Sequence, residues 1–154
     1  MNDLIDLNEL SLSGVYRELT RNGASTRAIF ALEREADLGD GGALTNDVTT
    51  DALSIGAQPV RATVCAREPM TIAGLAAIDD LMASYAISEQ FIIDTAVQDG
   101  ARVQAGETLA QVSGISAEIL AIERPMLNML SRLSGIATLA TRYVEAACQA
   151  APAV

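Results

Sequence analysis

The stretch from Glu123 to Thr138, ERPMLNMLSRLSGIAT, constrains the fold of this 154-residue chain more than any other. Its apolar residues recur every three or four positions, which is the spacing of one helix face. They continue toward the C-terminus as Met126, Met129, Leu130, Leu133, Ile136, Ala137, Ala140, Tyr143, Val144 and Ala147. A second stripe is polar: Arg124, Asn128, Ser131, Gly135, Thr138 and Arg142. The pattern predicts a helix with a core-facing side and a polar side that begins with a guanidinium.

Two residues set the expected limits of this helix. Pro125 is compatible with the first turn, where its missing N–H would have no partner. Ser134 is expected to cap a second helix, which divides the stretch at Ser134 and Gly135. We expect the second helix to run to about Cys148 and residues 151 to 154 to be frayed.

The middle of the chain has the sequence pattern of a small β-sheet. Val60, Ala62, Val64 and Ala66 alternate with polar residues, which predicts a strand with one buried face. Further on we expect a short strand at 70–75, a helix at 76–85, a strand at 91–97 that ends at the Asp99-Gly100 turn, and short β segments at 99–114.

The N-terminal part is expected to be helical. Residues 1 to 24 are interpreted as a loose arm or short helix that ends at the Asn22-Gly23 turn. Ser25 is expected to cap a helix that stops at Gly39, with Ile29, Phe30, Leu32 and Ala36 as its apolar positions. Residues 25 to 150 then form one domain of the α+β class, a small, mostly antiparallel sheet from residues 60 to 120 with helices from both ends packed on one face.

Composition excludes several functions. The formal charge is −10, which opposes binding to nucleic acid, and all ten basic residues are arginine, so the chain has neither Lys nor His. Schiff-base lysines and histidine bases or metal ligands are therefore excluded. Cys65 and Cys148 lie far apart, so no metal site is expected, and Cys65 has no partner base for catalysis. The first residues lack the features of a secretory leader, so the cytoplasm is the expected location.

Two segments have a second interpretation that the residues do not support. The glycine-rich segment from Asp37 to Thr45 lacks the Lys of a phosphate loop and contains acids that repel phosphate, so we interpret it as an ordinary loop. Residues 99 to 114 look like half of a biotinyl or lipoyl carrier domain. Such a carrier presents a lysine for covalent loading, and the chain has none.

The motif Glu-Arg, two residues, Leu-Asn, then Ser-Gly-Ile-Ala-Thr resembles the end of the N-terminal domain of quinolinate phosphoribosyltransferase, also called nicotinate-nucleotide pyrophosphorylase. The resemblance covers roughly residues 25 to 150. It implies an enzyme that joins quinolinate to phosphoribosyl pyrophosphate, with Mg²⁺, and releases pyrophosphate, carbon dioxide and nicotinate mononucleotide for NAD synthesis. It also implies a homodimer in which a C-terminal α/β barrel rich in Lys, Arg and His supplies most of the catalytic cations.

The resemblance also implies roles for single residues. Arg124 would hold a carboxylate of quinolinate in the neighbouring subunit's active site, because a guanidinium pairs bidentately with a carboxylate. Glu123 would be a structural partner or cap, and Asn128 would orient the local backbone. Ser134, Gly135 and Thr138 would let another helix or a barrel approach closely, and Arg132 and Arg142 would point into the dimer interface. No catalytic residue is expected within this chain, and we expect negligible turnover by the chain alone.

The sequence departs from the family pattern at three positions. Ala36 and Ala43 stand where the family's acidic loop has carboxylates, and Pro125 stands where the family usually has Thr or Val. The barrel would begin where this sequence stops, so we expect either a shortened gene product or a separate barrel polypeptide. Two alternatives remain open: the molybdenum-transport-associated relative of the same superfamily, and a non-catalytic dimerisation or regulatory module.

Overall fold

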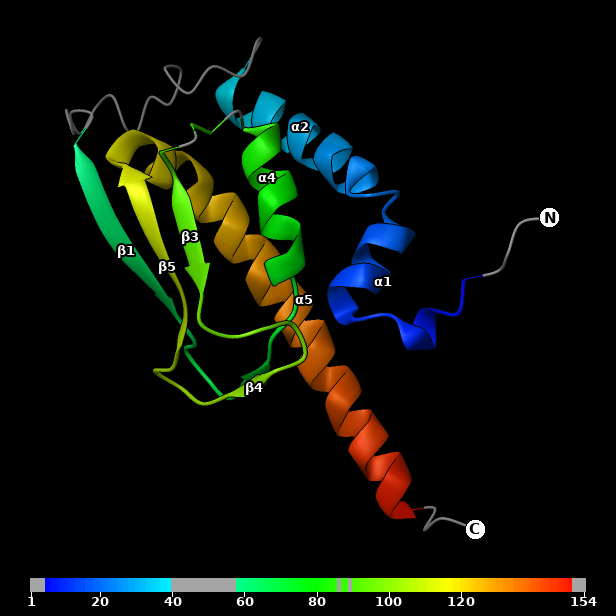
Figure 1. Ribbon diagram of the computed structural model, residues 1–154. Coiled ribbons are helices and arrows are strands. Elements are labelled where there is room, and N and C mark those ends of the chain that lie inside the picture. The colour runs from blue at the N-terminus through cyan, green and yellow to red at the C-terminus, as the bar shows by residue number, and fades with distance from the viewer. Residues whose placement is uncertain (1–4, 40–57, 86, 89, 151–154) are drawn as a thin grey trace.

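The computed structural model describes residues 5–39, 58–85, 87–88 and 90–150 of the chain. Residues 40–45 of the glycine-rich segment, Ala43 included, and residues 151–154 lie outside this part. The elements, labelled in Figure 1 where there is room, are η1 (Leu7–Glu9), α1 (Leu12–Leu19), α2 (Ala24–Leu38), β1 (Pro59–Cys65), β2 (Met70–Thr71), η3 (Leu75–Ala77), α4 (Ile78–Ser84), β3 (Ile92–Thr95), β4 (Arg102–Val103), β5 (Thr108–Ile115) and α5 (Ser116–Ala150). The predicted α+β fold is confirmed.

The main sheet has three antiparallel strands in the order β1-β5-β3, and β2 pairs with β4 in a separate two-stranded sheet. Val112 of β5 lies opposite Ala62 of β1 and Ile93 of β3, and this row packs against the core. The alternation predicted for residues 60–66 is therefore confirmed from Ala62 to Ala66, whereas Val60 is 38% exposed. The register fixes which side chains reach each face, because successive residues of a strand point to opposite sides.

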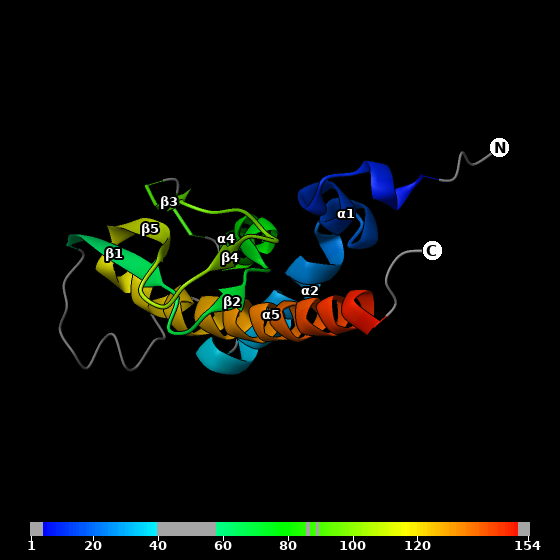
Figure 2. The same cartoon turned by 90° about the horizontal axis from the view of Figure 1, so that it is seen from below.

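The core lies between the main sheet and the helices. α5 runs along one face of the sheet, α4 packs beside it, and α2 packs on α4 (Figures 1 and 2). The largest cluster of buried apolar residues joins all of these elements: Phe30, Leu38, Ile78, Leu81, Tyr85, Phe91, Val112, Ile119, Ile122, Met126 and Leu130. The prediction that helices from both ends of the chain pack on one face is confirmed.

α5 differs from its prediction at both expected limits. It is one continuous helix of 35 residues that begins at Ser116, so Pro125 lies well inside it instead of in its first turn. The proline removes the hydrogen bond to the carbonyl of Ala121, a cost that packing on the core offsets. Ser134 is not an N-cap, because its buried hydroxyl bonds the backbone of Ala73 instead of starting a new helix.

The apolar stripe of α5 is core-facing only in its first part. Met126 and Leu130 are buried, whereas Ile136, Tyr143 and Val144 are more than 60% exposed. Figure 2 shows the reason, because α5 continues past the end of the sheet. The prediction of a core-facing stripe as far as Ala147 is therefore wrong for this chain by itself.

The strand predicted at 70–75 is shorter than expected. Only Met70 and Thr71 form β2, and the chain then turns at Gly74, whose φ is 111°, into η3 and α4. Asp99 starts this helical turn, because its carboxylate accepts the N–H groups of Leu75 at 2.9 Å and Ala76 at 3.1 Å. An aspartate 24 residues away in sequence thus ends the strand and begins the helix.

The N-terminal helices are fixed by one buried carboxylate. Asp80 is 3% exposed, accepts a hydrogen bond from the Tyr16 hydroxyl at 2.7 Å, and forms an ion pair with Arg27. α2 begins after Gly23, which has a φ of 79° and lies so close that a Cβ there would collide with the Asp80 carboxylate. The N-cap predicted at Ser25 is therefore wrong by two residues, because this close approach requires glycine.

The apolar face predicted for α2 is largely wrong. Phe30 is buried, but Ile29 and Leu32 are 65% and 69% exposed, and Ala36 is also exposed. The helix rests on α4 through Phe30, Leu38 and the polar contacts of Arg27. α1, the short helix predicted in the arm, has no buried residue.

Candidate functional site

Arg124 lies on the exposed side of α5, in the part of the helix that covers the sheet. Within the described residues its guanidinium has neither an ion pair nor a hydrogen bond. The backbone that carries it is fixed by Ile122, which is fully buried, and by Met126, which is 4% exposed. A free guanidinium on a rigid backbone can bind a carboxylate with little reorganisation of the main chain.

The polar stripe of α5 divides into two groups. Asn128 and Ser131 are exposed like Arg124, and the Ser131 hydroxyl donates to the carbonyl of Asn128 at 3.1 Å. Ser134 and Thr138 instead point toward β2 and bond its backbone. The structure therefore brings Arg124, Asn128 and Ser131 to one outward face and uses the two later hydroxyls inside the domain.

A groove of about 950 Å³ runs between α5 and β1, which is the outer strand of the main sheet. Its α5 wall carries the polar side chains of Glu123, Asn128 and Ser131. Its apolar lining includes Val60, Ala62, Val64, Met126, Leu127 and Leu130. The groove adjoins the outward face that carries Arg124, and it has the mixed lining of a surface that another protein segment or a planar ligand can occupy.

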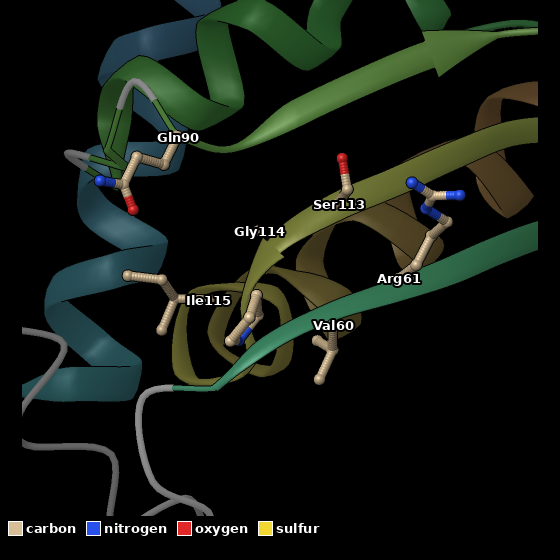
Figure 3. A pocket seen from close by; sticks show the side chains of 7 residues that line it. Val60, Arg61, Gln90, Ser113, Gly114 and Ile115 are labelled. Carbon is tan, nitrogen blue, oxygen red and sulfur yellow. The ribbon is translucent and has the colours of Figure 1, made fainter.

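A smaller hollow of about 350 Å³ lies at the ends of β1 and β5, next to Gln90 (Figure 3). Arg61 and Ser113 are register partners and rise from the same side of the sheet. That side is opposite to the one on which Ala62 and Val112 meet the core, because neighbouring residues of a strand alternate. Arg61 and Ser113 therefore lie on the side of the sheet away from α5, while Val60 lines both the hollow and the groove.

Two tyrosines have raised pKa values, and neither lines the groove. Burial raises the pKa of Tyr16; the Thr26 hydroxyl opposes this shift and the carboxylate of Asp80 adds to it. Burial, followed by the charges of Glu33 and Asp37, raises the pKa of Tyr85 to about 12. Both residues belong to the contacts of α2 and α4, so these shifts report on the packing of the helices.

The part of the chain that the structure describes contains no group of three or more Cys, Asp or Glu side chains placed to hold a metal ion. Cys65 is exposed beside the groove. None of the helices described is both long enough and apolar enough to cross a membrane.

The contacts that hold α5 on β2 were not predicted from the sequence. Besides Ser134 and Thr138, Thr141 takes part, because its hydroxyl lies 3.2 Å from that of Thr71. The signal in the sequence is the spacing of the three hydroxyls, four and then three residues apart, which places them on one helix face. That spacing overlaps the apolar stripe, so it could not be assigned to a partner strand before the fold was known.

Comparison with protein families identifies the family of the chain. Residues 47–134, more than half of the chain, match the family described as quinolinate phosphoribosyl transferase, N-terminal domain.

Two curated relatives match over similar regions. The carboxylating nicotinate-nucleotide pyrophosphorylase of Mycobacterium leprae is 36% identical over 105 residues, which is 65% of this chain and 35% of that protein. The decarboxylating quinolinate phosphoribosyltransferase 1 of Nicotiana glauca is 30% identical over 121 residues, which is 79% of this chain and 33% of that protein. The chain thus spans about a third of the length of these relatives.

Solved structures share the fold. The nicotinate-nucleotide pyrophosphorylase from Francisella tularensis superimposes with a TM-score of 0.71 at 19% identity, over 93% of this chain and 45% of that one. The enzyme of the same name from Ehrlichia chaffeensis gives a TM-score of 0.66 at 23% identity, over 89% of this chain and 42% of that one. At these identities the likeness concerns the fold.

Proposed function

This chain belongs to the N-terminal domain family of quinolinate phosphoribosyltransferase, and we propose that it is the substrate-binding and dimerisation part of such an enzyme. The reaction would convert quinolinate and phosphoribosyl pyrophosphate to nicotinate mononucleotide, pyrophosphate and carbon dioxide in NAD biosynthesis. In this proposal the chain contributes one side chain, Arg124, to a site completed by another polypeptide segment.

The observation that carries the proposal is the free guanidinium of Arg124 on a helix whose backbone is held by buried neighbours on both sides. Quinolinate carries two carboxylates, and an arginine offers a planar pair of donors that fits one of them. Arginine also keeps its charge at any relevant pH. The side chain would bind and orient the substrate, with no proton transfer.

The groups that promote the reaction would come from outside this chain. The transition state of phosphoribosyl transfer carries oxocarbenium character beside several anionic groups, so most of the stabilisation must come from cations. The sequence has no Lys or His, and within the described residues no acidic cluster is suited to Mg²⁺. We therefore assign Mg²⁺, which would accompany phosphoribosyl pyrophosphate, to the barrel, and we expect negligible turnover by this chain alone.

The second half of α5 supports a homodimer with barrel partners. Ile136, Leu139, Tyr143 and Val144 are 54% to 69% exposed on one helix. A run of large apolar side chains in solvent is typical of a surface that another domain or subunit covers. In the proposed enzyme this surface would meet a barrel, and the groove beside β1 would lie close to the same boundary.

The test is complementation. The chain is mixed with a family member whose own arginine, at the position that aligns with Arg124, has been replaced by glutamine, and formation of nicotinate mononucleotide is measured against quinolinate concentration. We expect turnover in the mixture well above that of either polypeptide alone. Arg124→Lys should raise KM for quinolinate roughly tenfold or more, because the bidentate contact is lost. Arg124→Gln should raise KM further and return turnover to the level of the partner alone.

Arg61→Gln is the matched control, since Arg61 is an exposed arginine on the opposite side of the sheet. It should leave KM unchanged. Turnover by the chain alone would show that the catalytic groups have been misplaced. An unchanged KM in Arg124→Gln would remove Arg124 from the site, and a dimer that forms no complex with any barrel would favour the non-catalytic module.

A further inference from the structure

Residues 70–73, which are β2 and the two residues after it, present two edges with different partners. On one edge the N–H of Ile72 donates to the carbonyl of Ala101 at 2.9 Å, and the N–H of Gly100 donates to the carbonyl of Ile72 at 2.7 Å. On the other edge the N–H groups of Thr71 and Ala73 point away from β4, as the alternation of a strand requires. These two donors meet α5 instead of another strand.

Two hydroxyl groups of α5 accept the hydrogen bonds that a neighbouring strand would otherwise accept on this edge. Thr71 donates its N–H to Oγ1 of Thr138 at 2.8 Å, and Ala73 donates its N–H to Oγ of Ser134 at 3.1 Å. Ser134 also donates its hydroxyl to the carbonyl of Ala73 at 3.3 Å. Ser134 is 2% exposed, so a lost partner here would leave buried polar groups unpaired.

The spacing of the two hydroxyls along α5 matches the spacing of their two partners along the backbone of residues 71–73. Four residues along a helix rise about 6.0 Å, and two residues along a strand rise about 6.6 Å. Hydroxyls at positions 134 and 138 therefore face the backbone at 73 and 71, with the helix and the strand running in opposite directions. Thr138 donates to the carbonyl of Ser134 at 2.7 Å, which fixes its rotamer within the helix.

We propose that Ser134 and Thr138 are positioning residues that set the axial register of α5 on β2 and, through it, the place at which Arg124 is presented. This rests on the proposed function for what Arg124 binds. Arg124 lies ten residues before Ser134 on the same helix, about 15 Å along its axis. An axial shift of α5 by four residues, the spacing of the two hydroxyls, would move the Arg124 guanidinium about 6 Å. That distance is farther than a bidentate contact tolerates.

Hydrogen bonds add a directional constraint that apolar burial lacks. The free energy of apolar burial is non-directional, whereas a hydrogen bond weakens steeply with angle and distance. Beyond Leu130 the only buried residue of α5 is Ser134 in the part of the chain described. The hydroxyl contacts, with the 3.2 Å contact of Thr141 and Thr71, therefore link this part of α5 to β2, and the exposed ion pair of Glu145 with Arg102 links it to β4.

The two cysteines of the sequence provide the measurement. Cys65 lies at the end of β1, Cys148 lies near the end of α5, and both are exposed. Nitroxide labels on the two thiols report the position of α5 relative to the sheet by pulsed EPR, with excess unlabelled chain added so that only distances within one chain contribute. No engineered labelling site is needed.

The Ser134→Ala/Thr138→Val double variant should shift or broaden the distance distribution by up to about 6 Å, one step of the pair. Thr138→Ser keeps the hydroxyl and should give the wild-type distance distribution, whereas Thr138→Val should not. Ser131→Ala is the matched control, because that hydroxyl bonds only within its own helix. A double variant with native far-UV circular dichroism and an unchanged distribution would overturn the proposal.

Amide exchange keeps the proposal testable if the double variant does not fold. In the wild-type chain the N–H groups of Thr71 and Ala73 should be protected from exchange, and unprotected groups would overturn the proposal. In the complementation assay Thr138→Val should raise KM for quinolinate roughly 10- to 100-fold, with Thr138→Ser near wild type. If the wild-type mixture is inactive, the proposed function fails, while the EPR and exchange results still decide on the register.

Discussion

The two halves of α5 have the same apolar spacing and opposite surroundings. In the first half Ile119, Ile122, Met126 and Leu130 are buried against the sheet and α4. In the second half Ile136, Leu139 and Tyr143 face solvent, while the side of the helix that packs on β2 carries hydroxyl groups. Helical periodicity therefore indicates that a face will be covered, but it does not say by which part of a protein.

This difference also separates the two tasks of the helix. Apolar burial holds the first half, which carries Arg124, against the core. The directional bonds of the second half are proposed to set the axial register of the whole helix, and they leave its apolar side free for a partner. A helix of 35 residues, about 52 Å long, can do both because it extends past the sheet that it covers.

The largest expected contrast comes from truncating one isoleucine in each half. Ile122→Ala should lower the free energy of unfolding by about 2–5 kcal/mol, because Ile122 is fully buried and its loss leaves a cavity. Ile136→Ala should change it by about 0.5 kcal/mol or less, since Ile136 is 67% exposed. Urea denaturation at low chain concentration measures both values. A large loss in Ile136→Ala would mean that a second copy already covers the open face.

The sequence was sufficient where the pattern depends only on the geometry of the element itself. The alternation at 60–66 predicted β1, and the apolar spacing around Met126 predicted the core face of α5, because each pattern is imposed by the element's own geometry. It failed where a distant residue decides the outcome. The Asp99 carboxylate accepts the N–H of Leu75 and begins a helical turn where a strand was predicted. The Asp80 carboxylate lies so close that position 23, the N-cap of α2, must be glycine. The Ser134 hydroxyl bonds the backbone of Ala73 and therefore does not cap a new helix.

The candidate site shows the same limit. The motif around Arg124 was recognisable from the sequence, and the placement of Arg124 with Asn128 and Ser131 on one face follows from helical spacing. The groove beside them could not be predicted, because its other wall is β1, some 60 residues earlier in the chain. Whether a polar stripe faces solvent or a neighbouring strand depends on what the fold places beside each turn.

A smaller contrast compares a buried tyrosine with an exposed one. Tyr85 is 1% exposed, and its hydroxyl has no hydrogen-bond partner within the described residues. Tyr85→Phe should therefore stabilise the chain by about 1–2 kcal/mol, because the cost of burying an unpaired hydroxyl disappears. Tyr143→Phe is the control and should have little effect, since Tyr143 is 69% exposed.

The pH dependence provides an independent check on Tyr85. Its folded pKa is raised to about 12 from the ordinary value of 10.0. The unfolded chain therefore releases this proton first, so the stability is constant with respect to Tyr85 below pH 10 and falls as the pH rises from 10 to 12. Tyr85→Phe should reduce that decline in chemical denaturation curves. An unaltered decline would show that the phenol is hydrated.

The smallest expected effect tests the open half of α5 at Gly135, an exposed glycine in mid-helix with nothing within 4 Å of the place where a Cβ would lie. Gly135→Ala should stabilise the isolated chain by about 0.5–1 kcal/mol, because alanine favours the helix. Ala140→Gly, an exposed position on the same helix, should cost a similar amount. Thermal unfolding compares the two variants.

The same substitution should weaken the complex with a barrel partner, because a glycine that costs helix stability and meets nothing in its own chain allows another backbone to approach closely. Titration of the complementing partner gives the dissociation constant for wild type and Gly135→Ala. A variant that is more stable alone and binds less tightly supports a close contact at this turn. A variant that improves both would place the covering surface farther along, around Tyr143, and the open face would then begin about two turns after Ile136.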